Sequence, residues 1–200
     1  MNCIKLSAIQ LDALREVSNI GAGNAATALS QLLNKKIDMT VPAVNVIELE
    51  ELFEVIPEEQ IVVGVLVRVL GDAPGNMLFL FEKKSASYII ELLTGKKEKE
   101  LSEMGASVLC EIGNIISSAY MNAIAKMINL SIMPSVPGLA YDMMSAIITA
   151  TFAESVEWNE SILQIETKLL GEHKEAIEGY FYYLPNPGSL EKIFNSIGVI

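Results

Sequence analysis

The sequence has little of the residues on which metal sites, disulfide frameworks and most nucleophilic triads depend. It contains one histidine and two cysteines in 200 residues. Two thiols, Cys3 and Cys110, do not make a disulfide framework in a chain of this size. A single histidine, His173, argues against a Ser-His-Asp triad and against a zinc site. We therefore expect the chain itself to bind no metal and no cofactor.

Positive charge is also scarce. The formal net charge is −11, from 14 Lys and Arg against 25 Asp and Glu. Proteins that bind nucleic acid carry a basic stripe, so this balance argues against a nucleic-acid partner and equally against an anionic membrane surface. A basic patch on another protein is the natural complement, although the same charge could serve solubility alone.

Long apolar runs are missing as well. No uninterrupted run approaches the roughly 18 residues that a transmembrane helix requires. The N-terminal residues MNCIKLSAIQ lack the basic start and apolar block of a signal peptide. We expect a cytoplasmic protein with no membrane contact.

What the chain does contain is an internal repeat with an offset of 95 residues. Residues 6–42 align without a gap on residues 101–137 and share eleven identities. Most of these are apolar and would follow from shared packing. Glu16/Glu111 and Asn19/Asn114 would not, so they are candidates for a shared function.

Each half is predicted to follow the order α-β-β-β-α. Ser7 and Ser102 are predicted to cap long helices that end near Leu33 and Ile128. In the first half, strand-like runs occupy 37–49, 60–70 and 75–82, and a short helix capped by Ser85 occupies 85–93. In the second half, strand-like runs occupy 138–152, 161–170 and 178–185, and a short helix occupies 188–197. We predict an α/β (α+β) fold in a single domain, 1–200, with halves 5–94 and 100–200. Its one six-stranded sheet, mixed or antiparallel, carries both long helices on one side.

Two asparagines and two glycines stand in the first long helix, in EVSNIGAGNAATALS (16–30). On a helical wheel the outward face carries a polar arc that small residues continue, and we predict partner contacts at Asp12, Gly23, Ser30, Ser107 and Ser118 beside the Glu/Asn pairs. An ordinary solvated face would carry Lys, Glu and Gln instead. The small residues predict that another protein's backbone comes close. Gly21 and Cys110 are predicted to face inward, Gly21 to allow close packing on the sheet.

The Glu-x-x-Asn pairs suit one kind of chemistry. An asparagine amide does not titrate, but it both donates and accepts hydrogen bonds and can orient a water molecule. Phosphoryl transfer requires mainly such positioning and charge stabilisation, because its transition state is loose. The chain has no phosphate-binding loop and no metal-ligand cluster, so the phosphoryl group and its magnesium are expected on a partner.

At these residues the sequence resembles the CheC/FliY/CheX family of chemotaxis phosphatases. The family motif is an Asp or Ser, a Glu four residues later and an Asn three residues further on, and it reads DALREVSN (12–19) and SVLCEIGN (107–114) here. Val-Pro pairs at 41–42 and 136–137 fit the family too, and the resemblance covers essentially the whole chain. It implies hydrolysis of the aspartyl phosphate on CheY, the response regulator, which would hold the Mg²⁺.

The resemblance also implies roles and partners. Asn19 and Asn114 would orient the attacking water, and Glu16 and Glu111 would contact a lysine of CheY. Two sites in a chain of this length resemble the CheC branch, whose members also bind the receptor deamidase CheD. We expect a monomer or a heterodimer with CheD. The alternative is a non-catalytic adaptor that binds CheD or CheY.

Overall fold

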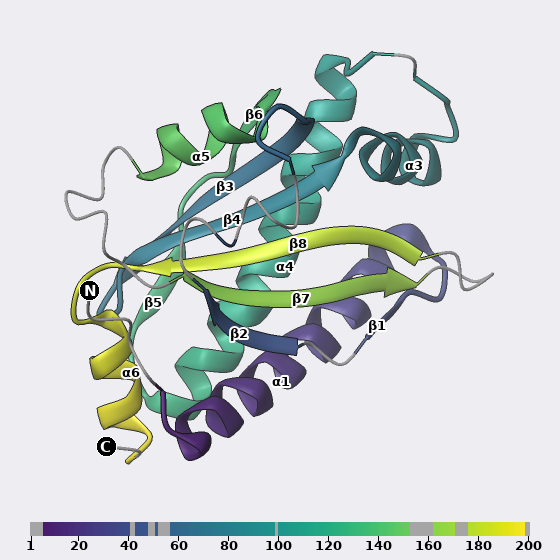
Figure 1. Cartoon of the computed structure of the whole chain (residues 1–200). Coiled ribbons are helices and arrows are strands. Elements are labelled where there is room, and N and C mark those ends of the chain that lie inside the picture. The colour runs from purple at the N-terminus through teal and green to yellow at the C-terminus, as the bar shows by residue number, and fades with distance from the viewer. Residues whose placement is uncertain are drawn as a thin grey trace.

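The computed structural model describes residues 6–40, 43–47, 51, 57–98, 100–152, 162–170 and 176–198. These form one antiparallel sheet with helices on both faces (Figure 1). The helices are α1 (Ala8–Leu33), α3 (Lys83–Thr94), α4 (Glu103–Ile128), α5 (Met144–Phe152) and α6 (Ser189–Ser196). The strands are β1 (Asp38–Met39), β2 (Ala43–Ile47), β3 (Ile61–Gly71), β4 (Gly75–Glu82), β5 (Ile132–Pro134), β6 (Gly138–Met143), β7 (Ile162–Leu170) and β8 (Ala176–Pro185).

The eight strands occupy six positions across the sheet. The order is β1-β7-β8-β4-β3-β5, with β2 beside β1 on the β7 edge and β6 beside β5 on the β3 edge. Every pairing is antiparallel. The expected six-stranded sheet is therefore present as six positions, and each half places its first strands on the far edge of the other half.

One row of residues across the sheet shows the relation between the halves. Successive register partners are Val44, Ile165, Phe181, Phe79, Val65 and Leu139. The outer two are separated by the same 95 residues as the helices. Each strand on one side of the row has its counterpart from the other half on the other side, β2 with β6, β7 with β3 and β8 with β4. A pseudo-two-fold axis therefore passes between Phe79 and Phe181, whose rings stack with centroids 4.8 Å apart.

Alternation along the strands gives the sheet two apolar faces. On β4, Met77, Phe79 and Phe81 belong to the larger core under α1 and α4, while Leu78 and Leu80 point to the opposite face. Residues of α3 and α6 also join the larger core. The two long helices therefore lie on one side of the sheet, as predicted, and cross behind it in Figure 1.

The ends of the long helices follow from local sequence. Ser7 accepts a hydrogen bond from the backbone N–H of Gln10, whose side chain in turn accepts one from the backbone N–H of Ser7, which completes a capping box. Ser102 caps α4 by accepting from the backbone N–H of Gly105. Both helices end at an asparagine in the left-handed conformation, with φ of 48° at Asn34 and 51° at Asn129.

Two local predictions are wrong. The run 138–152 is not one strand, because β6 ends at Met143 and α5 begins at Met144. Met144, Ile147 and Ile148 are buried at helical spacing on the second face of the sheet, which explains the helix. The short helix near Ser85 begins at Lys83 instead, after Glu82, which makes no capping bond through its side chain.

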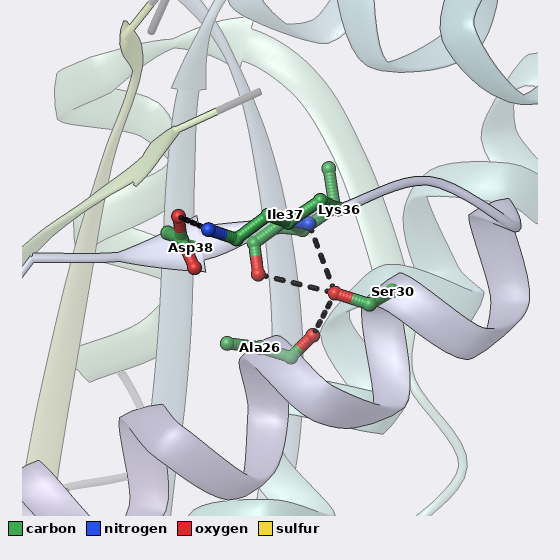
Figure 2. Close-up of polar contacts among 5 residues, drawn as sticks. All are labelled: Ala26, Ser30, Lys36, Ile37 and Asp38. Carbon is green, nitrogen blue, oxygen red and sulfur yellow. Dashed lines mark hydrogen bonds and ion pairs between the residues drawn. The ribbon is translucent and has the colours of Figure 1, made fainter. Parts of the chain in front are cut away.

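Ser30 fastens the end of α1 to the chain that leads into β1. Its hydroxyl oxygen accepts a hydrogen bond from the backbone N–H of Ile37 at 2.9 Å and lies 2.7 Å from the carbonyl oxygen of Ala26 and 3.1 Å from that of Ile37 (Figure 2). Lys36 and Asp38 form an exposed ion pair beside it. The second half has Ala125 at the position of Ser30, so only α1 can have this serine clasp.

Within the described residues, α4 alone is long and apolar enough to cross a membrane by length and composition. The sequence was expected to contain no membrane-spanning helix because it has no uninterrupted apolar run of sufficient length. In α4 the charged Glu111 interrupts the apolar sequence. Half of the apolar window is buried inside the fold. We read α4 as a core helix, because Leu109, Ile112 and Ile116 belong to the core under the sheet.

Candidate active site

The first Glu/Asn pair lies on the exposed face of α1. Glu16 and Asn19 are exposed, while Leu14 and Val17 on the other side of the helix are buried. Neither polar side chain makes a hydrogen bond or ion pair with the described part of the chain, so both are available to a partner. Residues three apart lie on the same side of a helix, and one ligand can therefore meet both.

Charged neighbours flank this first pair. Asp12 accepts a hydrogen bond from the guanidinium of Arg15 at 3.2 Å, and both side chains are largely exposed. An exposed ion pair of this kind contributes little to stability. Its consequence is local: the carboxylate of Asp12, the guanidinium of Arg15 and the carboxylate of Glu16 are all exposed within two turns of α1 before Asn19.

The second pair lies on α4, in different surroundings. Glu111 is exposed and Asn114 is half-buried. Both line an open depression of about 530 Å³, which continues over Ser107 and Cys110 and is closed on its far side by residues 134–137. Ser107 replaces Asp12 and Cys110 replaces Arg15, so among the described residues that line this depression Glu111 alone is charged.

Cys110 was predicted to face inward, and this is wrong. It is half-buried and lines the depression beside Glu111. Partial burial raises the pKa of its thiol above the ordinary value. A thiol with a raised pKa is less ionised at neutral pH and is a poor nucleophile, so Cys110 contributes surface here rather than reactivity. Cys3 and His173 lie outside the described residues.

The small residues on the two helices divide into exposed and buried groups. Gly23 is exposed, and a Cβ there would meet nothing within 4 Å. Ser107 is exposed and Ser118 is half-buried. Ser30 does not continue the outward arc as predicted, because its hydroxyl holds the backbone of Ile37. The partner contacts at Asp12, Gly23, Ser30, Ser107 and Ser118 stay predictions.

Gly21 is buried, as expected, but its neighbour is a helix and not the sheet. A Cβ at Gly21 would lie 2.7 Å from Cδ1 of Tyr120, so the glycine admits the ring of an α4 residue. The glycine that lies against the sheet is Gly113 of α4, where a Cβ would lie 2.6 Å from Cγ1 of Val65. The two glycines of α1 therefore have different explanations. Gly21 allows close helix packing, and Gly23 lies on an open surface.

The loop that faces the second pair was not expected from the sequence. Pro134, Ser135, Val136 and Pro137 line the depression opposite Glu111 and Asn114. The Val-Pro pair, repeated at 41–42 and 136–137, was the available signal, but periodicity does not place a loop beside a helix. Residues 41–42 lie outside the described part of the chain. No group of three or more His, Cys, Asp or Glu residues that could hold a metal occurs among the described residues.

Comparison with known proteins places this arrangement in a family. A model of the CheC-like family matches residues 9–46 and 104–141, once in each half. The CheY-P phosphatase CheC of Bacillus subtilis (strain 168) is 34% identical over 196 residues, which cover 94% of both chains. The chain belongs to the CheC-like family. Its two CheC-like matches contain both Glu/Asn pairs and extend into β2 and β6.

Solved structures of similar fold extend this comparison. FliY of Thermotoga maritima superposes with a TM-score of 0.82 at 20% identity, covering 98% of each chain. A complex of CheX with CheY, BeF₃ and Mg²⁺ from Borrelia burgdorferi matches with a TM-score of 0.55 at 15% identity, covering 83% of this CheC-like chain and 96% of that one. At these identities the similarity establishes the fold.

Proposed function

We propose that this CheC-like chain is a phosphatase that hydrolyses the aspartyl phosphate of the response regulator CheY. One observation carries the proposal: a Glu-x-x-Asn pair, with the Glu exposed and the Asn outside the buried core, occurs at equivalent positions of two related helices. It occurs in a chain 34% identical to a CheY-P phosphatase. Core packing gives no reason to repeat an acid and an amide outside the buried core at this spacing.

The asparagines are the proposed catalytic residues. The amide of Asn19 or Asn114 would hold a water molecule in line with the phosphorus atom by donating to it and accepting from it. The attacking water needs little activation, because the transition state for phosphoryl transfer is loose and charge is spread over the phosphoryl oxygens. CheY would supply the phosphoryl group and the Mg²⁺ that stabilises this charge. This chain would supply orientation.

The glutamates would fix the orientation of the partner. Glu16 and Glu111 lie one turn before each asparagine, on the same side of the helix. A lysine of CheY paired with this carboxylate would set the distance between the amide and the phosphorus atom. Positioning of this kind contributes a large part of the rate in reactions that need little covalent chemistry. The acidic net charge of −11 favours encounter with such a basic partner surface.

The two sites offer a lysine different electrostatic surroundings. At the first site Arg15 lies between Asp12 and Glu16 in sequence, and at the second Cys110 takes its place without a charge. We place the protein in the cytoplasm with its substrate. CheD as a further partner rests on family resemblance alone.

The experiment that separates an enzyme from a binding adaptor is a phosphate-release assay. Phosphorylated CheY with Mg²⁺ is incubated with and without the purified chain, and inorganic phosphate is followed in time. We expect release to accelerate in proportion to a catalytic amount of the chain. Stoichiometric binding of CheY without acceleration would favour the adaptor instead.

A further inference from the structure

Val136 is the most exposed large apolar side chain among the described residues, at 89% of its accessible surface. It lies in the segment between β5 and β6. Single exposed apolar residues are common on protein surfaces and need no explanation of their own. Two further observations set Val136 apart from the others.

The first observation is that the loop is hydrogen-bonded to β3. The backbone N–H of Ser135 donates to the carbonyl of Arg68 at 2.9 Å, and the hydroxyl of Ser135 accepts from the backbone N–H of Arg68 at 3.0 Å. Prolines at 134 and 137 fix their own φ angles on either side. The valine is therefore presented to solvent from a short segment that has little freedom to fold it away.

The second observation is its position. Val136 lines the same open depression as Glu111 and Asn114, on the opposite wall. The depression lies between α4 and this loop, so a protein that reaches Asn114 through it passes Val136. The other strongly exposed apolar residues, such as Met104 at 64% and Met133 at 54%, do not line the depression.

We infer that Val136 is a substrate-positioning residue of the second site, which docks against an apolar surface of CheY beside its phosphorylated aspartate. This inference rests on the proposed function. Burial of a preorganised side chain contributes to affinity without the cost of ordering it. Contact on both walls, Glu111 on α4 and Val136 on the loop, would fix the angle at which the aspartyl phosphate meets Asn114.

The test uses a background in which the first site is disabled, Glu16→Arg/Asn19→Ala, with both changes on exposed positions. Val136→Ser in that background removes the apolar contact and keeps the backbone. We expect the KM for phosphorylated CheY to rise roughly ten-fold, as loss of one buried aliphatic side chain implies, with kcat nearly unchanged. Val136→Ile should restore the KM, because it restores the apolar surface.

Met133→Ser is the matched control, since Met133 is exposed and apolar in the adjacent strand β5 but lies outside the depression. It should leave the KM unchanged. Val136→Ser in an Asn114→Ala background should not alter turnover at the first site. Circular dichroism checks that each variant is folded.

Binding of CheY activated with beryllofluoride and Mg²⁺ is measured in parallel by titration calorimetry, so that the contact is read even where turnover is slow. An unchanged KM and an unchanged affinity in Val136→Ser would overturn the inference. Absence of phosphate release by the unmodified chain would contradict the proposed function instead, and the two failures are therefore distinguishable.

Discussion

Replacement of Gly21 by alanine tests the packing between the two long helices. A Cβ at this position would lie 2.7 Å from Cδ1 and 2.9 Å from Cγ of Tyr120, far inside ordinary carbon contact. The ring cannot swing away freely, because it is fully buried and its centroid is 4.9 Å from that of Phe181. The added methyl group must therefore separate α1 from α4 or distort the ring.

The magnitude follows from two opposing effects. Overpacking of a close-packed core costs about 1–3 kcal/mol. Alanine gains up to about 1 kcal/mol over glycine in a helix interior. We expect Gly21→Ala to lower the free energy of unfolding by about 1–2 kcal/mol. Gly23→Ala is the matched control, because a Cβ there meets nothing within 4 Å, and it should raise stability by about 0.5–1 kcal/mol.

Urea denaturation gives both values from the shift in midpoint at unchanged m-value. A double-mutant cycle with Tyr120→Leu locates the cause, since removal of the ring should make Gly21→Ala neutral or stabilising in that background. If Gly21→Ala stabilised the unaltered protein as much as Gly23→Ala does, the close approach of Tyr120 to α1 would be wrong.

Other predictions concern buried hydroxyl groups. Tyr120→Phe should raise the free energy of unfolding by up to about 1 kcal/mol, because the Tyr120 hydroxyl is buried without a hydrogen-bond partner in the described structure. Tyr183→Phe should lower it by about 0.5–1.5 kcal/mol, because the Tyr183 hydroxyl donates to the carbonyl of Ala73. Equal effects of the two substitutions in urea denaturation would refute this difference. Burial raises the pKa of both tyrosines, so at high pH the native state keeps phenolic protons that the unfolded chain loses. The stability that the neutral tyrosines contribute is therefore fully present below about pH 10 and falls as the pH rises above it. Denaturation midpoints measured across that range should fall less steeply in Tyr120→Phe. Ser30→Ala should cost about 1–2 kcal/mol through loss of the clasp to Ile37, and an unchanged midpoint would show that the clasp is unimportant.

The long helices and their caps could be predicted from sequence because their determinants are local. Ser7, Gln10 and Ser102 act on residues within one turn, and the Glu/Asn pairs follow from helical spacing alone. The repeat added the symmetry, since whatever holds for α1 is expected of α4. That reasoning correctly gave both long helices on one side of a single sheet.

The rest depends on contacts between distant segments. Pairing of β2 with β7 and of β6 with β3 crosses from one half to the other, and no local pattern records it. The same limit applies to the loop opposite Glu111, because pairing of the flanking strands β5 and β6 with β3 positions residues 134–137 beside the second site. A short apolar run such as 144–148 fits a strand or a helix equally well. Cys110 lies at the boundary between the buried and exposed faces of α4, where an ideal helical wheel wrongly predicts that the side chain faces the core.

If Asn19 and Asn114 orient the attacking water, their replacement must slow phosphate release without unfolding the protein. Phosphate release from phosphorylated CheY with Mg²⁺ is compared for the unmodified chain, Asn19→Ala, Asn114→Ala and the double variant, each checked by circular dichroism. Each single variant should retain the activity of the other site, and the double variant should lose roughly 10²–10³-fold in kcat while it stays folded and still binds CheY. A folded double variant with full activity would contradict the mechanism.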